Sequence, residues 1–174
     1  MAKVFVSIGS NQDREHNICG GLDALNATFS ELRLSPVYES DAVGFDGAPF
    51  YNLVGEFLTE LELPALNAVL KDIEDQHGRC RKSDSLGRTL DIDILTYDNL
   101  IGDFSGIQLP RAEVLINAFV LRPLAELATK ARHPESGETY QDLWRDFDKE
   151  KQPLVAIDFS WQDQKISVAE ITAD

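Results

Sequence analysis

The stretch Thr89–Tyr97, TLDIDILTY, decides the fold of this chain. Its apolar and polar residues alternate, and this period of two predicts a strand with one face in a hydrophobic core. Asp91 and Asp93 stand two positions apart, so both carboxylates lie on the other face, with Cα atoms roughly 7 Å apart. The sequence therefore predicts a strand that presents two neighbouring acidic side chains on one side of a sheet.

The segments before this strand predict alternating strands and helices. Runs of β-forming residues predict strands, and apolar residues at helical spacing predict helices. In chain order the elements are strand 3–8, helix 17–29, strand 32–38, loop 39–49, strand 50–58, a helix from Pro64 to the Gly78 stop, and strand 89–97. Pro36 interrupts the strand 32–38, which suggests an edge strand or a bend. The order β-α-β-β-α-β predicts an α+β fold with a ferredoxin-like core.

Extra elements follow this core at the C-terminal end. The apolar stretch 118–127 predicts a helix that Pro123 limits or kinks. A short helix at 140–147 and a strand at 155–161 are predicted after it. No repeat or low-complexity linker interrupts the 174 residues, so we expect a single domain, 1–174.

The charge balance restricts the partners. The chain carries 16 Lys and Arg against 30 Asp and Glu, a net charge of −14. Such an acidic chain repels nucleic acid and anionic membranes. No apolar run is long enough for a signal peptide or a membrane span. Neither of the two cysteines lies in a metal- or redox-type pair. We therefore expect a cytoplasmic protein with no nucleic-acid or membrane partner.

The aspartate pair is a candidate metal site. Two carboxylates this close repel each other unless a cation neutralises them, and Mg²⁺ takes a few carboxylates together with substrate phosphates. Arg79, Arg81, Lys82 and Arg88 place four of the 16 cations within ten residues just before the pair. Arginine forks suit phosphate oxygens. An acidic strand face beside a solvated basic loop is the alternative; the two features together favour polyphosphate binding.

A second group could bind a flat heterocycle. Phe50 and Asn52 share one face of their predicted strand and offer an aromatic ring and an amide. A core phenylalanine beside a surface asparagine is an equally common arrangement. Glu74, on the polar side of its helix, could accept a ribose hydroxyl or be a solvated residue.

Several motifs resemble the hydroxymethyldihydropterin pyrophosphokinase family in order and spacing over roughly residues 2–147. They are Gly9-Ser10-Asn11, Phe50-x-Asn52, Gly78-Arg79-x-Arg81, Gly87–Ile94 and Phe119-Val-Leu-x-Pro123-Leu124. The block RTLDIDI is the most specific of these. Members of the family move a diphosphate from ATP to a pterin alcohol and release AMP in folate biosynthesis.

The resemblance implies a role for each matching residue. Asp91 and Asp93 would hold two Mg²⁺ ions, and Arg79 and Arg88 would be catalytic, stabilising the transferring diphosphate. The implied ATP site comprises Lys71, Glu74, Arg79, Arg81, Arg88, Ile94 and Arg111. The implied pterin site comprises Ser40, Val43, Phe50, Asn52 and Phe119, with the two rings sandwiching the heterocycle. Loops 39–49 and 81–87 would close as mobile lids.

The departures from the family pattern fall in the implied ATP site. The family has Gln, Arg, Trp, His and Arg at the positions of Lys71, Ser85, Leu86, Arg111 and Asn117, and a Pro before Arg88. We hypothesise that Arg111 replaces part of the lost positive charge. The expected activity is a Mg²⁺-dependent diphosphotransferase that uses ATP and the pterin as small-molecule partners, with a monomer as the working expectation. The alternatives are a divergent pterin-binding relative with weak or no transfer, or another nucleotidyl- or phosphotransferase with a D-x-D metal pair.

Overall fold

The computed structural model describes residues 1–44, 46–78 and 89–170. The strands are β1 (Ala2–Ser10), β2 (Ser30–Leu34), β3 (Tyr38–Ser40), β4 (Phe50–Thr59), β5 (Asp91–Tyr97), β6 (Gly102–Phe104), β7 (Ile107–Leu109), β8 (Leu154–Ala156), β9 (Phe159–Trp161) and β10 (Gln164–Ser167). The helices are α1 (Arg14–Thr28), α2 (Leu63–Gln76), α3 (Glu113–Ile116), α4 (Ala118–Leu127) and α5 (Tyr140–Arg145).

A six-stranded sheet organises the molecule. Its strand order is β5-β1-β4-β3-β8, β2 pairs with β4 as well, and every pair is antiparallel. The long strands β1, β4 and β5, with α1 and α2 as their connections, form the predicted ferredoxin-like core. The expected α+β fold class is confirmed. None of the helices in the described ranges combines the length and apolar character that a membrane span needs.

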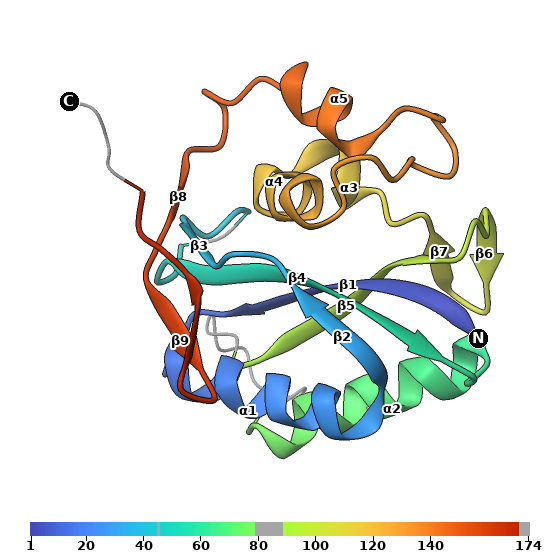
Figure 1. The fold of residues 1–174 in the computed structure, drawn as a ribbon, viewed down its shortest axis with the longest axis horizontal. Coiled ribbons are helices and arrows are strands. Elements are labelled where there is room, and N and C mark those ends of the chain that lie inside the picture. The colour runs from blue at the N-terminus through green and yellow to red at the C-terminus, as the bar shows by residue number, and fades with distance from the viewer. Residues whose placement is uncertain (45, 79–88, 171–174) are drawn as a thin grey trace.

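Helices cover both faces of the sheet (Figure 1). Val4, Val6 and Ile8 of β1 are buried in a core shared with α1 and α2. Phe5, which points to the other face, packs in a second core with α4 and Tyr140 of α5. Because side chains alternate along a strand, one sheet supports two hydrophobic layers.

The strand β5 positions the acidic pair. Ile92 and Ile94 are buried in the core with α1 and α2, so Asp91 and Asp93 lie on the α4 face. The register against β1 shifts between Phe5 and Val6, where Leu95 is the extra residue of a bulge. Leu95 then packs in the second core, which anchors β5 just beyond the aspartates.

Two predicted elements are divided in the structure. The strand predicted at 32–38 is two strands, β2 and β3, because the chain bends at Ser35-Pro36-Val37. Ser35 holds the bend: its N–H donates to Val54 O and its Oγ accepts from Val54 N, both at 2.9 Å. The strand predicted at 155–161 is likewise divided into β8 and β9, and β10 then pairs with β9.

Pro123 does not limit α4; of the two predicted effects, a limit is wrong and a kink stays a prediction. The helix runs from Ala118 to Leu127 with Pro123 inside it. A proline inside a helix removes one backbone hydrogen bond, and its ring crowds the carbonyl four positions earlier, so other contacts must offset this cost. Leu121 and Leu124, both fully buried in the second core, hold the helix in place on either side.

Candidate active site

A cavity of about 170 Å³ opens on the α4 face of the sheet, where β1 ends and β4 and β5 begin. Its walls come from four strands, the loop after β3, and α4. The lining residues are Ser7, Ile8, Gly9, Ser40, Asp41, Val43, Phe50, Asn52, Asp91, Asp93 and Phe119. The cavity thus brings together all five residues predicted to bind the pterin and both predicted metal ligands.

The strand register explains this convergence. Gly9 of β1 pairs with Asn52 of β4 on one side and with Asp91 of β5 on the other, and Ser7 pairs with Asp93. Neighbouring strands lie about 4.8 Å apart, so Asn52 and Asp91 stand about 10 Å apart across the sheet. The Asn52 amide and the carboxylates of Asp91 and Asp93 therefore form adjacent parts of one surface.

Gly9 keeps the floor of the cavity open. A Cβ atom at this position would lie 3.0 Å from Asn52 Oδ1 and 3.7 Å from the Phe50 ring. The first distance is shorter than ordinary van der Waals contact, so a side chain here would displace the amide. The glycine therefore permits the close approach of Asn52 to β1.

The amide of Asn52 is oriented by its neighbour on β3. Its Nδ2 donates to the hydroxyl of Ser40 at 2.8 Å, and both side chains are buried. An asparagine amide has two N–H donors and a carbonyl acceptor, so a donor and an acceptor remain for a planar ligand. Phe50 from β4 and Phe119 from α4 add two aromatic rings to the same cavity.

Two cations stand beside Asp93. Its Oδ1 lies 3.8 Å from Lys71 Nζ on α2 and 3.7 Å from Arg111 Nη2, in the segment after β7. Each cation also contacts a glutamate. Lys71 Nζ lies 2.9 Å from Glu74 Oε1, and Arg111 Nε lies 3.1 Å from Glu113 Oε2.

The positions of these charges follow from the local fold. Lys71 and Glu74 are three residues apart, on the face of α2 that meets β5. The Glu74 side chain is completely buried. The N–H of Arg111 donates to Leu95 O at 2.9 Å, which ties the segment after β7 to β5. Predicted ATP-site residues from two distant parts of the chain thus lie next to Asp93.

The donor set of the acidic pair fits Mg²⁺ better than a metal enclosed by protein. Within 1–44, 46–78 and 89–170, no three His, Cys, Asp or Glu side chains gather into a metal-binding cluster. Mg²⁺ is commonly held by one or two carboxylates and completes its octahedron with water and substrate phosphates. Asp91 and Asp93 can supply that protein share.

Some predicted site residues are not described by the structure, and one lies on the opposite face of the sheet. Arg79, Arg81 and Arg88, the substituted Ser85 and Leu86, and the predicted lid 81–87 lie outside the described residues. The Ile94 side chain is 3% exposed and packs in the core on the opposite face of the sheet. Its predicted contact with ATP remains a prediction.

The predicted lid 39–49 is attached to the start of α1. Arg14 Nη1 lies 2.7 Å from Glu39 Oε2 and donates to Pro49 O at 3.2 Å. Asn11 Nδ2 donates to Ala48 O at 3.1 Å. These contacts join both ends of the loop to the segment after β1; the predicted lid motion remains a prediction.

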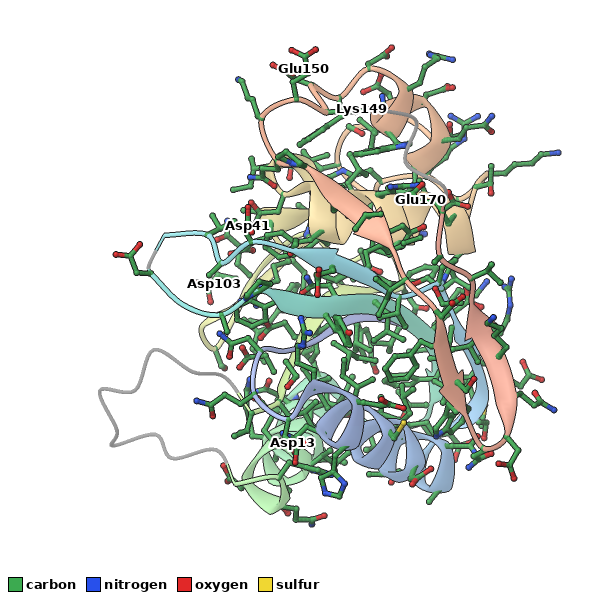
Figure 2. The ribbon with its side chains drawn as sticks, turned by 90° about the vertical axis from the view of Figure 1, so that its left-hand side faces the viewer. Asp13, Asp41, Asp103, Lys149, Glu150 and Glu170 are labelled. Atoms are coloured by element: carbon green, nitrogen blue, oxygen red, sulfur yellow. The ribbon has the colours of Figure 1, made fainter. Side chains whose placement is uncertain are left out.

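Four lining residues were not predicted as site residues: Ser7, Ile8, Gly9 and Asp41. Ile8 was predicted only as part of the first strand, and its side chain is buried in the core with α1 and α2. The alternation of β1 carries the signal for Ser7, because it has the opposite parity to the buried Val4, Val6 and Ile8. Gly9 lies in a recognised motif but has no functional group. Asp41 is exposed on the loop after β3 (Figure 2), and nothing in the sequence pattern distinguishes it from other surface acids.

Comparison with known proteins agrees with this geometry. The sequence profile described as 7,8-dihydro-6-hydroxymethylpterin-pyrophosphokinase (HPPK) matches residues 5–129. A Pseudomonas aeruginosa protein, 2-amino-4-hydroxy-6-hydroxymethyldihydropteridine pyrophosphokinase, is 37% identical over 138 residues, which cover 76% of this chain and 85% of the relative. A Bacillus subtilis protein of the same name is 32% identical over 149 residues, 81% and 89% of the two chains.

Longer proteins contain a similar region. The folic acid synthesis protein fol1 of Pneumocystis carinii is 30% identical over 173 residues; these cover 93% of this chain but only 23% of that protein. The crystal structure of wild-type Plasmodium falciparum HPPK-DHPS aligns with a TM-score of 0.72 at 12% identity, over 95% of this chain and 50% of that one. At that identity the alignment supports the fold alone.

Proposed function

The chain belongs to the 7,8-dihydro-6-hydroxymethylpterin-pyrophosphokinase family, and we propose that it transfers a diphosphate from ATP to 6-hydroxymethyl-7,8-dihydropterin, releasing AMP in folate biosynthesis. One observation carries the proposal: an amide, two aromatic rings and two carboxylates line a single cavity. A flat heterocycle and a metal–polyphosphate complex can therefore meet there.

The proposed pterin site is the half of the cavity formed by β3, β4 and α4. Asn52, held by Ser40, would hydrogen-bond the edge of the pterin ring, and Phe50 and Phe119 would stack on its faces. Val43 would add apolar contact from the loop after β3. Because the ring would be oriented by these groups, its hydroxymethyl oxygen would be directed toward β5.

The proposed nucleotide site adjoins Asp91 and Asp93. These carboxylates would hold two Mg²⁺ ions, which when bound reduce the charge on the phosphates and polarise the acceptor oxygen. Arg111 and Lys71, within 4 Å of Asp93, would contribute positive charge toward the phosphates. Glu74 would contact the nucleotide from α2. Arg79, Arg81 and Arg88 are assigned to the ATP phosphates by family resemblance.

In the proposed reaction the hydroxymethyl oxygen bonds to the β-phosphorus of ATP. The bond from that phosphorus to the oxygen bridging the α- and β-phosphates breaks, and AMP departs with that oxygen. The hydroxyl proton is lost to solvent or to phosphate, since no described side chain in the cavity is assigned as its base. The protein contributes mainly position and electrostatic stabilisation, which are the largest contributions in phosphoryl-type transfer.

A divergent pterin-binding protein with weak or no transfer is the second candidate. It is favoured by the engagement of Asn117, which stands where the family has an arginine and accepts a hydrogen bond from Gln152 at 3.1 Å. That side chain supplies no positive charge to a nucleotide.

The deciding experiment gives the purified protein ATP, Mg²⁺ and the pterin alcohol and measures AMP. We expect stoichiometric AMP and pterin diphosphate. Pterin binding with intact ATP would overturn the activity and leave the second candidate. The Asp91→Ala/Asp93→Ala double variant should lose turnover by orders of magnitude and still bind the pterin. Wild-type AMP release from that variant would contradict the metal assignment.

A further inference from the structure

The segment before β8 holds the start of α4 through one side chain, Gln152. Its Oε1 accepts from the N–H of Ala118, the first residue of α4, at 2.7 Å. Its Nε2 donates to Asn117 Oδ1 at 3.1 Å and to Ile116 O at 3.3 Å. One amide thus joins the end of α3 to the beginning of α4 across 34 residues of chain.

The start of α4 needs such a partner. The first N–H groups of a helix have no acceptor within the helix and are usually capped by a side chain of the preceding residue. Asn117 precedes α4, yet its side chain makes no capping bond to the helix. Gln152 supplies the acceptor instead and orients the Asn117 amide as well.

The orientation of the Gln152 amide is fixed by its partners. Only the carbonyl end can meet the Ala118 N–H, and only the NH₂ end can meet the two oxygens of Ile116 and Asn117. A thioether would remove all three contacts, whereas a carboxylate would keep the acceptor for Ala118 and lose the donor to Ile116 and Asn117. Variants of similar size therefore separate the acceptor role from the donor role.

Phe119 is the residue next to the capped position. It lines the candidate cavity, and it also lines a second hollow that Gln152 and Leu154 line as well. Phe119 therefore belongs both to the proposed pterin site and to the hollow that the segment before β8 borders. Its placement depends on the first turn of α4, since its backbone lies within that turn.

We propose that Gln152 is a positioning residue that fixes Phe119 for stacking on the pterin. This inference rests on the proposed function of the cavity. Without the cap, the first turn of α4 frays, and only a fraction of molecules presents the ring in its binding position. The apparent pterin affinity falls by that fraction, because the ligand must reorder the turn on binding.

The test compares wild-type protein with Gln152→Met and Gln152→Glu. Met removes all three hydrogen bonds at similar volume; Glu keeps the acceptor for Ala118 but sets a charged oxygen against Ile116 O and Asn117 Oδ1. Loss of a helix cap corresponds to about a fivefold change in an equilibrium constant. We expect about fivefold weaker pterin binding for Met and a loss at least as large for Glu, with ATP binding within about twofold of wild type.

Two further readouts separate positioning from a general loss of stability. KM for the pterin should rise with kcat at saturation nearly unchanged. Amide exchange of residues 118–121 should accelerate in the free variants and return toward the wild-type rate with saturating pterin. Gln164→Met is the matched control, because Gln164 is an exposed glutamine of β10 for which the structure gives no side-chain hydrogen bond.

The outcomes are distinct. Wild-type pterin affinity in Gln152→Met, or an equal loss of pterin and ATP affinity, would overturn the positioning role and leave the proposed function intact. A wild-type protein that does not bind the pterin would overturn the proposed function, and this inference with it.

Discussion

Lys71 Nζ on α2 lies 3.8 Å from Asp93 Oδ1 on β5, and Arg111 Nη2 lies 3.7 Å from the same oxygen. The second carboxylate of the acidic pair is therefore already in contact with two positive charges. A Mg²⁺ ion that binds this carboxylate must share it with both. Lys71 and Arg111 each have two opposing effects on the proposed site. Their positive charges repel the metal ion and attract the ATP phosphates.

Lys71→Gln should make the proposed site easier to load with metal. The substitution removes one charge close to Asp93 but keeps an N–H donor for the buried Glu74. At this partly exposed position we expect the Mg²⁺ concentration for half-maximal nucleotide binding to fall on the order of threefold. Binding of a non-hydrolysable ATP analogue, followed as Mg²⁺ is added, measures this concentration. Lys130→Met, on an exposed turn, is the control, and an unchanged Mg²⁺ requirement would contradict the prediction.

Arg111→Ala should weaken ATP binding severalfold. The guanidinium is about a third exposed and close to the acidic pair, so it is available to phosphate oxygens. Calorimetry with the ATP analogue and Mg²⁺ gives the affinity. Arg145→Ala removes an exposed arginine paired with Asp142 on α5 and should have no effect. If Arg111→Ala binds the nucleotide as well as wild type, its role as a replacement charge is wrong.

Gly9→Ala should reduce pterin affinity by about tenfold or more with little loss of global stability. The added Cβ would lie 3.0 Å from Asn52 Oδ1, so the amide must shift by a few tenths of an ångström from the position in which it bonds to Ser40. Fluorescence titration with the pterin measures the affinity, and thermal unfolding measures the global stability. Gly55→Ala is matched to it: the residue lies in β4, and its added Cβ meets only contacts of 3.5 Å or more. Equal pterin affinities for the two variants would refute the close-approach argument.

Glu170→Gln should lower thermal stability in a pH-dependent way. The Glu170 carboxylate accepts hydrogen bonds from Arg122 Nη1 and Nη2 at 2.9 and 2.8 Å and from the Ala156 N–H at 2.8 Å. The hydrogen bonds from Arg122, with a smaller contribution from the Ala156 N–H, lower the pKa of Glu170 below its ordinary value of 4.5. The folded state therefore favours the ionised form, and this stabilisation is fully present above about pH 4.5.

The measurement is Tm against pH. We expect the variant to melt about 2 °C below wild type at pH 7. The gap should narrow as pH falls through the lowered pKa of Glu170, because the wild-type carboxylate then takes up a proton. Glu60→Gln, an exposed acid for which the structure gives no ion pair, should show no such gap. A constant Tm difference from pH 7 down to pH 3 would contradict the linkage.

The core of the fold could be predicted because the apolar residues that recur at strand or helix spacing in the sequence are the ones that the structure buries. The alternation of Ile92 and Ile94 with the aspartates is an example, since the pattern and the observed faces of β5 agree. Pro36 indicates an edge or a bend within the strand predicted at 32–38, and the chain does bend there. The contacts that hold the bend could not be predicted, because they join Ser35 to Val54 on another strand. A helix in the stretch 118–127 was predicted, but its continuation past Pro123 was not, because tertiary packing outweighs the local cost of the proline.

The candidate site was predictable where residue type carries the chemistry, as for the aspartate pair and Phe50. Gly9 acts by the absence of a side chain, and its importance appears only when Asn52 is seen opposite it. The partners of Arg111 were equally hidden, because its contact with Asp93 requires the segment after β7 to return to β5.

The pairing of β8 with β3 has a consequence for the behaviour of shortened chains. Leu154–Ala156 occupies the hydrogen-bonding edge of Tyr38–Ser40. A chain cut before Leu154 would leave that edge bare, and exposed edge strands recruit strands from other molecules. Such a fragment should therefore self-associate through its sheet and precipitate at concentrations where the intact chain stays dispersed.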